Sequence, residues 1–292
     1  DQACWELTDE KCAIKEMEWA AIQEFRGRKA DDPIKEVNAM QYLHDRMQLA
    51  GDGANNGREY VIHPVDKLTD GICLFLVLPF YNGGELFDRI AASQMFNEVD
   101  ARIAIRQILR GIGVLQSAGI CHRDISLENI MLHDDSCKII DLGMSLLIPY
   151  RTVKDDDVII ESGAENITHR GIGNASQVKL LLSPAGRKGK RLYVSPEIYN
   201  NVVPFDGFAV DLWAVGIMLF IMVTGFPPWD NSSLADERFR YMTGGYLVQL
   251  LTEWELGLSP ELMDLLQGML YRDSNQRLCL QQILEHPWFN QD

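Results

Sequence analysis

The residues best suited to chemistry lie in four short motifs that contain lysine, aspartate, asparagine and glutamate. These motifs are CAIK (12–15), HRDISLEN (122–129), DLG (141–143) and SPE (195–197). Phosphoryl transfer asks a protein for positive charge around the transferred group and for a carboxylate that orients the accepting hydroxyl. The four motifs together contain side chains of these types. Each motif alone is a weak signal, so their order and separation along the chain decide what they mean.

Taken in order, the four motifs resemble the signature set of the eukaryotic protein kinases. The resemblance covers nearly the whole chain, from Cys4 to the HPWF motif at 286–289. The segments GGELFDRI, TGFPPWD and ILEHPWF look most like the calcium/calmodulin-dependent group of serine/threonine kinases. The stretch SLEN lacks the Ala/Arg pattern that follows HRD in tyrosine kinases. The resemblance therefore implies transfer of the γ-phosphate of ATP, with Mg²⁺, to serine or threonine hydroxyls of proteins.

The resemblance also implies catalytic roles for single residues. Asp124 would accept the proton of the substrate hydroxyl, and Asn129, five residues later, would hold one Mg²⁺. Asp141 of DLG would hold Mg²⁺ that bridges the phosphates. Lys15 would contact the α- and β-phosphates, and Glu36, on the helix that follows, would be its ion-pair partner.

The segment LPFYNGGELFD (78–88) resembles the hinge of the kinases, which contacts adenine. Leu78 would be the gatekeeper. Pro79 has no N–H but keeps the carbonyl that the amino group of adenine needs, and Tyr81 would supply the neighbouring backbone donor. Ala13 would pack on the adenine face. Glu85 completes this set of residues at the nucleotide cleft.

The expected substrate is a protein with basic residues near the target hydroxyl. In related basophilic kinases, acids at the positions of Glu85 and Glu128 receive an arginine three residues before that hydroxyl. Some relatives carry a further acid where this chain has Ile221, so we expect no strong demand for arginine at −2. The formal net charge of −15 and pI near 4.8 fit cationic partners and argue against nucleic acid.

Ser126 departs from the family pattern, because the resemblance implies a lysine there that touches the γ-phosphate. Relatives have threonine directly after the glycine of GKRLYVSPE (189–197), where this chain has Lys190. We expect that Lys190 supplies the missing charge and Ser126 the missing hydroxyl, since a lysine acts as a point charge on a long stem. The alternative is that Lys190 belongs to the exposed basic run GRKGKR and points to water.

A second departure concerns the Gly-rich loop that covers the ATP phosphates in the family. Counting back from Lys15, this loop would fall before Asp1. Either the loop is not represented in the given sequence, or the small lobe binds nucleotide poorly, and we favour incomplete representation. Together the two departures leave an alternative function open. The chain would then be a pseudokinase, a scaffold that binds nucleotide or partner proteins without efficient phosphotransfer.

The activation segment, from Asp141 to Glu197, is unusually long, with the excess in residues 150–188. Arg123 precedes the catalytic Asp, which in relatives often accompanies activation by an upstream kinase. Ser183, followed by proline, is the leading candidate for the phosphorylated residue, ahead of Thr168 and Ser176. A phosphate there would order the segment through arginine contacts.

The expected fold is α+β with the two lobes of a protein kinase. Residues 1–81 would form the small strand-rich lobe, and residues 82–292 the larger helical lobe with the catalytic loop and the activation segment. Extended runs in the small lobe are KCAIKEM, EYVIHPVDKL and ICLFLVLPF, and Asp31-Asp32-Pro33 would open its helix.

Three helices are expected in the large lobe. Residues 100–119 form an amphipathic pattern, residues 209–225 form a nearly apolar one, and Ser259 caps a helix whose first residue is Pro260. By resemblance, the buried Asp211 would hydrogen-bond the backbone of the catalytic loop. Glu197 and Arg277 resemble the pair that ties the activation segment to the helical lobe; their sequence positions favour this structural role.

Composition bounds the remaining possibilities. No apolar run reaches the roughly 18–20 uncharged residues of a membrane span, so none is expected. The six cysteines show no metal-ligand spacing, and most lie in apolar runs. We expect reduced thiols in an intracellular protein, cytoplasmic or nuclear.

Overall fold

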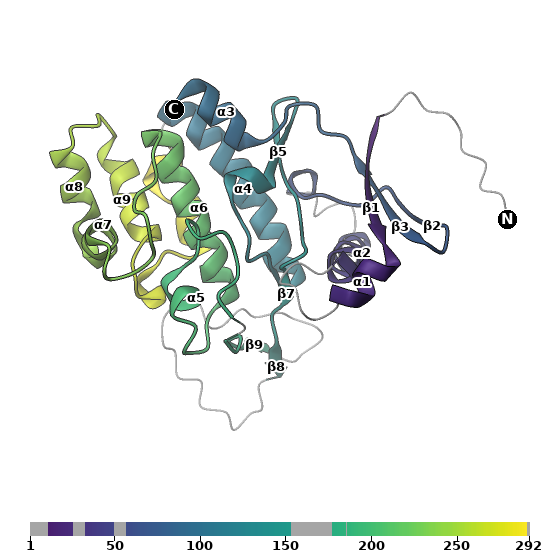
Figure 1. Ribbon diagram of the computed structural model, residues 1–292. Coiled ribbons are helices and arrows are strands. Elements are labelled where there is room, and N and C mark those ends of the chain that lie inside the picture. Colours follow the sequence, from purple (N-terminus) through teal and green to yellow (C-terminus); the bar gives the residue numbers. More distant parts are fainter. Residues whose placement is uncertain (1–10, 26–32, 50–56, 153–176, 185, 291–292) are drawn as a thin grey trace.

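The structure is a computed structural model that describes residues 11–25, 33–49, 57–152, 177–184 and 186–290. Figure 1 shows a small part with a sheet and two helices beside a larger, mostly helical part. The predicted α+β division into a small strand-rich part and a larger helical part is observed. The predicted lobe boundary at residue 81 stays a prediction. Residues 57–62, which were assigned to the small lobe, lie against the helical part, where Val61 forms a bridge with Ile139.

The sheet of the small part consists of β1 (Cys12–Glu18), β2 (Asp66–Thr69) and β3 (Cys73–Pro79). All pairs are antiparallel, in the order β1-β3-β2. The register places Ala13 opposite Leu78 and Lys15 opposite Leu76, and Leu76 is completely buried. The sheet therefore brings the expected adenine and phosphate contacts onto neighbouring strands.

The extended run predicted for EYVIHPVDKL is wrong over most of its length. Only Asp66–Thr69 is a strand, and Arg58–Tyr60 forms the 3₁₀ turn η2. Gly57, at φ 108°, starts this turn in a conformation that favours glycine. Pro64 has no N–H for a ladder hydrogen bond, which keeps the strand from starting earlier.

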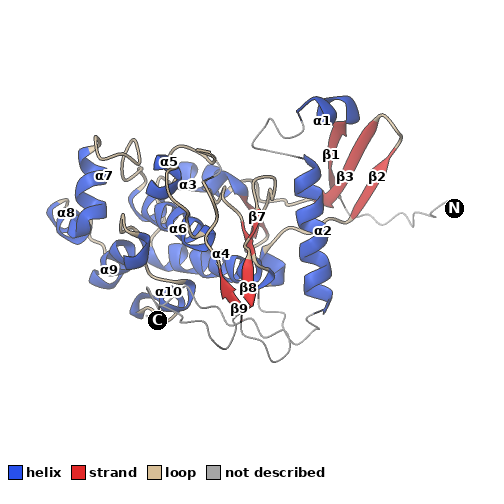
Figure 2. Cartoon of the chain, turned by 90° about the horizontal axis from the view of Figure 1, so that it is seen from below, coloured by secondary structure: helices blue, strands red, loops and turns tan. Residues whose placement is uncertain are grey.

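Two helices flank the sheet, as Figure 2 shows. The sequence did not indicate α1 (Trp19–Phe25), which follows β1 directly. The helix α2 (Pro33–Leu49) was predicted, and its first residue is the proline that suits the first helical turn. Met40 and Leu43 of α2 are buried, so this helix is held by apolar packing.

The larger part is built around α4 (Glu98–Ala118) and α6 (Gly207–Thr224), both predicted within two residues. Asn97 caps α4 by accepting a hydrogen bond from the backbone N–H of Asp100, and Gly119 ends it at φ 76°. The other helices are α3 (Leu86–Ser93), α5 (Pro196–Asn200), α7 (Glu237–Tyr241), the π-helix η4 (Met242–Tyr246), α8 (Leu247–Glu253), α9 (Pro260–Met269) and α10 (Leu280–Leu284). Ser259 caps α9 as predicted.

The helix α6 runs through the core, with every residue buried. Among the described residues it is the one helix that is long and apolar enough to cross a membrane, but it is mostly buried inside the protein. We therefore assign α6 as a core helix, which agrees with the sequence analysis.

Three pairs of short strands frame the loops that carry the motifs. They pair β4 (Ile120–Cys121) with β7 (Leu146–Leu147), β5 (Ile130–His133) with β6 (Ser136–Ile139), and β8 (Tyr150–Thr152) with β9 (Gln177–Lys179). The loop 122–129 joins β4 to β5, and the loop 140–145 joins β6 to β7. Because β4 pairs with β7 and β5 with β6, both loops emerge on adjacent strands. Among the described cysteines, Cys12, Cys73, Cys121, Cys137 and Cys279 are free thiols, and Cys4 lies outside the described residues.

Candidate active site

The loop that contains Asp124 is hydrogen-bonded to a buried carboxylate of α6. Asp211 accepts hydrogen bonds from the backbone N–H groups of His122 and Arg123, both at 2.7 Å. Arg123 has φ 69°, and these two bonds hold the backbone in that turn. Burial raises the pKa of Asp211 to about 7, against the lowering effect of the two N–H groups. The expected structural role of Asp211 matches this geometry.

Asp124 and Asn129 are joined directly. Asn129 Nδ2 donates to Asp124 Oδ2 and to the backbone carbonyl of Asp124, both at 2.8 Å. The 3₁₀ turn η3 (Leu127–Asn129) makes this closure possible over five residues. Burial raises the pKa of Asp124, while the charge of Lys190 and the bond from Asn129 act in the opposite direction. The carboxylate is thus fixed in orientation, as a group that receives a proton from a bound hydroxyl must be.

Asp141 lies beside this turn. The backbone N–H of Ile140 donates to the carbonyl of Asn129 at 3.0 Å, and His122 Nε2 lies 2.9 Å from the carbonyl of Ile140. Asp141 has φ 65°, and its Oδ1 accepts from the N–H of Gly143 at 3.0 Å. Leu142, which stands where the family often has Phe, is completely buried.

The donor set fits Mg²⁺. The side-chain oxygens of Asn129 and Asp141 are hard ligands on adjacent loops, and Mg²⁺ is usually held by one or two carboxylates together with substrate phosphates. Within the described residues, no group of three or more His, Cys, Asp or Glu side chains could hold a metal alone. The site therefore suits a metal that arrives with a phosphate ligand rather than a metal in an all-protein cage.

Lys15 and Glu36 form an ion pair between β1 and α2. Lys15 Nζ donates to Glu36 Oε2 at 2.6 Å, as their order along the chain led us to expect. The Glu36 side chain is 3% exposed and that of Lys15 is 38% exposed. The buried acid thus fixes the position of a partly exposed ammonium, and a charged group held in this way can bind phosphate oxygens.

The residues expected around adenine lie at the end of β3, in the segment that follows it, and on the paired strand β1. Leu78 and Pro79 end β3, with Ala13 opposite Leu78. The ring of Tyr81 is half-buried and lies 5.6 Å from the ring of His133. Glu85 is the N-cap residue of α3 and bridges to Met131, so it lies over the strand that follows the catalytic loop.

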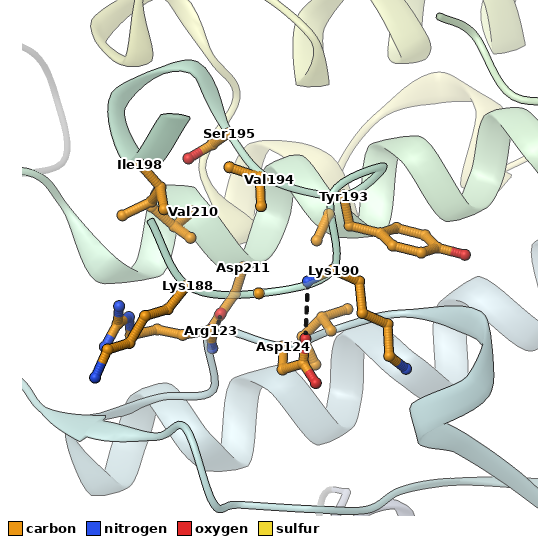
Figure 3. A pocket seen from close by; sticks show the side chains of 13 residues that line it. Arg123, Asp124, Lys188, Lys190, Tyr193, Val194, Ser195, Ile198, Val210 and Asp211 are labelled. Carbon is orange, nitrogen blue, oxygen red and sulfur yellow. Dashed lines mark hydrogen bonds between the residues drawn. The ribbon is translucent and has the colours of Figure 1, made fainter. Parts of the chain in front are cut away.

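Residues 188–195, near the end of the activation segment, pack against the catalytic loop (Figure 3). Between them is a narrow cavity with a volume of about 20 Å³, lined by Asp124, Lys190 and Tyr193 among others. The backbone N–H of Lys190 donates to Asp124 Oδ1 at 3.3 Å, the bond that is dashed in Figure 3. The ammonium of Lys190 lies 2.7 Å from Ser126 Oγ. The residues at the two departures from the family pattern are therefore hydrogen-bonded to each other.

Below this segment, Arg277 holds Glu197 through two bonds of 2.7 and 2.8 Å. The guanidinium is buried over the ring of Trp213 and also donates to the carbonyls of Tyr271 and Arg272. A satisfied, bidentate pair of this kind fixes the end of the activation segment on the helical part.

These features decide the family. The model of the family described as "Protein kinase domain" matches residues 2–289. The chain belongs to the protein kinase family.

Three relatives show how similar this kinase domain is in sequence to known protein kinases. It is 30% identical over 241 residues to the serine/threonine-protein kinase chk1 of Schizosaccharomyces pombe, a match that covers 80% of this chain and 41% of the relative. It is 29% identical over 238 residues to the calcium/calmodulin-dependent protein kinase cmkB of Emericella nidulans, covering 81% and 52%. CBL-interacting protein kinase 1 of Oryza sativa subsp. japonica is 27% identical over 220 residues, covering 75% and 40%. The chain thus spans about half the length of these relatives or less.

Sequence reasoning missed two contributors to the site of this kinase domain. Tyr193 Oη lies 3.5 Å from the backbone N–H of Leu127, and His122 joins the catalytic loop to the strand before Asp141. The signal was present for both, since His122 opens the HRD motif and Tyr193 follows Lys190 by three residues. Thr168 and Ser176, and the acidic run 155–157, lie outside the described residues.

Proposed function

We propose that this kinase domain transfers the γ-phosphate of ATP to serine or threonine hydroxyls of proteins. The observation that carries the proposal is the ion pair between Lys15 and the buried Glu36, because this pair must be in place for kinase catalysis. When bound, MgATP supplies the phosphoryl group. Asp124 would orient the accepting hydroxyl and take its proton, Asn129 and Asp141 would hold Mg²⁺, and Lys15 would contact the phosphates.

The proposed substrate carries arginine three residues before the target hydroxyl. Support comes from two half-buried acids, Glu128 in the turn that carries Asn129, and Glu85, which bridges to Met131 just after that turn. Glu128 already contacts one cation, since Lys190 Nζ lies 3.4 Å from its Oε2. The net charge of −15 also favours encounter with cationic peptides.

The test compares two serine peptides that differ only in arginine or alanine at −3, in the full-length protein. We expect Glu85→Gln and Glu128→Gln each to lower kcat/KM for the arginine peptide by about fivefold, the size of a salt bridge of about 1 kcal/mol. The loss for the alanine peptide should be smaller than the loss for the arginine peptide. Glu253→Gln, on the exposed face of α8, is the matched control. Equal loss with both peptides would refute a role in arginine recognition.

We also propose activation by an upstream kinase at Ser183. This residue is exposed and precedes Pro184. In the part of the chain that the structure describes, Nε and Nη2 of the buried Arg123 have no hydrogen-bond partner, which suits an incoming phosphate. Phosphatase treatment should lower the activity of the wild-type protein and leave Ser183→Ala unchanged. Equal phosphatase sensitivity of both proteins would rule out Ser183.

A pseudokinase is the second candidate, and Ser126 favours it because the usual catalytic-loop lysine is missing. A scaffold of this kind binds MgATP without phosphorylating any peptide. Titration of nucleotide binding beside the peptide assay separates the two functions.

A further inference from the structure

The ammonium of Lys190 is surrounded by oxygens of the catalytic loop. It lies 2.7 Å from Ser126 Oγ, 3.3 Å from Asn129 Oδ1 and 3.4 Å from Glu128 Oε2. The Lys190 side chain is 35% exposed, whereas Ser126 is completely buried. The alternative in which Lys190 points to water therefore does not describe this geometry.

The backbone around Lys190 explains how a residue of another segment reaches this place. Gly189 has φ 104°, and a Cβ there would lie 3.2 Å from the carbonyl oxygen of Arg123. Only glycine lets the segment approach the catalytic loop so closely without strain. The N–H of Lys190 donates to Asp124 Oδ1, and its carbonyl accepts from the N–H of Tyr193 at 2.9 Å. The lysine stem starts beside Asp124 and ends over the turn that carries Asn129.

The charges near Asp124 leave Lys190 as the best placed cation. Arg123 and Lys188 lie on the opposite side of Asp124 from the Lys190 side chain in Figure 3. The guanidinium of Arg123 stacks over Phe205 at 5.8 Å. The ammonium of Lys190, in contrast, contacts side-chain oxygens of the turn that follows Asp124. A preorganised cation at this point acts on the charge of the transferred group.

We propose that Lys190, from the activation segment, is the cation that contacts the transferred phosphoryl group, and that Ser126 positions its ammonium. The proposal rests on the proposed kinase function. In it, Lys190 supplies the charge that relatives place on the catalytic loop, and Ser126 supplies the hydroxyl that relatives place after the glycine. Lys190 is not consumed: the bond from the γ-phosphorus to the ADP oxygen breaks, the bond to the substrate oxygen forms, and the hydroxyl proton passes to Asp124. A consequence is that withdrawal of the activation segment also withdraws the catalytic charge.

The experiment uses the full-length protein and three variants: K190T, the exchange variant S126K/K190T, and the control R187A. The control removes one positive charge from the same basic run, where Arg187 is exposed. We expect K190T to lower kcat by about 100-fold, as for loss of one transition-state contact. S126K/K190T, which places the lysine on the catalytic loop, should recover to within about tenfold of the wild type, and R187A should match the wild type.

Calorimetric titration with Mg-AMP-PNP and with MgADP provides a readout that does not need turnover. We expect K190T to weaken Mg-AMP-PNP binding by about fivefold and to leave MgADP binding unchanged, because only the former carries a γ-phosphate. For Ser126 as a positioning residue, S126A should lower kcat and leave KM for the peptide unchanged.

The outcomes separate the two proposals. Undiminished turnover in K190T, in a wild-type protein that is active, would overturn the role of Lys190 and keep the kinase. Equal weakening of Mg-AMP-PNP and MgADP binding in K190T would also overturn the role of Lys190. This test remains valid if S126K/K190T does not fold. An inactive wild type in which K190T weakens only Mg-AMP-PNP binding would refute the kinase function and keep the γ-phosphate contact.

Discussion

At the scale of single residues, each chemically important side chain is held by a partner from another element. Glu36 of α2 holds Lys15 of β1, Asp211 of α6 holds the backbone before Asp124, and Ser126 accepts from Lys190. Such partners fix orientation, which matters because phosphoryl transfer depends on position and charge more than on covalent chemistry by the protein.

The ion pair between Lys15 and Glu36 gives a direct prediction. Glu36→Gln removes the carboxylate but keeps the shape, so kcat/KM for ATP should fall by about tenfold, or about 1.4 kcal/mol, since water screens the exposed end of Lys15. Glu24→Gln, on exposed α1, is the control. Steady-state kinetics at varied ATP measures the effect, and an unchanged KM and kcat would show that the pair has no role in nucleotide use.

The buried Asp211 gives a pH prediction. Its pKa is about 7 in the folded protein and ordinary in the unfolded chain, so folded Asp211 keeps its proton to higher pH. Its contribution to the free energy of unfolding is fully present below pH 3.8 and is lost as the pH rises through about 7. The free energy of unfolding in urea, taken as wild type minus Asp211→Asn, should therefore fall as the pH rises from 3.8 to about 7.

Asp88→Asn, exposed on α3, serves as the control for this series. A difference between wild type and Asp211→Asn that rises with pH, or stays constant, would contradict the raised pKa. Above about pH 7 the difference should become flat, because both folded and unfolded Asp211 are then ionised.

At the scale of elements, short strand pairs set the loops beside each other. The sequence could predict α2, α4, α6 and α9, because caps, prolines and glycines mark their ends. It could not predict α1, which lacks such signals, or the turn at Arg58–Tyr60, where contact with the helical part overrides the apolar pattern.

The site was predictable to a similar degree and for a physical reason. The motif pattern singles out Asp124, Asn129 and Asp141, and the structure brings them together on two adjacent loops. The contact between Lys190 and Ser126 could be hypothesised from two departures at once, but its geometry depends on the approach of Gly189 to Arg123, which no local pattern encodes.

That close approach is testable with matched glycines. Gly189 and Gly186 both have positive φ, so alanine at either costs about 1–2 kcal/mol of backbone strain. Only at Gly189 does the added Cβ meet backbone, at 3.2 Å from the oxygen of Arg123; at Gly186 the nearest atom is Lys188 Cε at 3.9 Å. Gly189→Ala should lower kcat by about tenfold or more, and Gly186→Ala should not. Equal kcat in both variants would contradict the account.

The β8–β9 pair predicts how the long segment enters the fold. Thr152 pairs with Gln177, so Asn-Gly in place of residues 153–176 can close the hairpin with a two-residue turn. Lys179 is held at the base by Asp206, which caps α6. We expect kcat/KM to stay within about threefold of the wild type, because the short turn keeps the β8–β9 pair and Lys179 in place. Loss of activity in a variant with an unchanged melting temperature would assign a catalytic role to residues 153–176.

At the scale of the whole molecule, the site lies where the small sheet meets the helical part. Lys15 and Glu36 come from the first, and Asp124, Asn129 and Asp141 come from the second. Residues 57–62 run along the helical part, and Ile62 donates to the carbonyl of Ile139 at 2.8 Å. Residues 57–62 therefore connect the small sheet to the helical part through backbone contacts.

The most direct test of the central claim is transfer of labelled γ-phosphate from ATP to a serine peptide with arginine at −3, in the full-length protein beside Asp124→Asn. We expect label in the peptide with wild type and about 1000-fold less with Asp124→Asn, because the carboxylate that orients and deprotonates the hydroxyl is gone. Wild type that binds MgATP but transfers no label, or transfers it as fast as Asp124→Asn, would contradict the account.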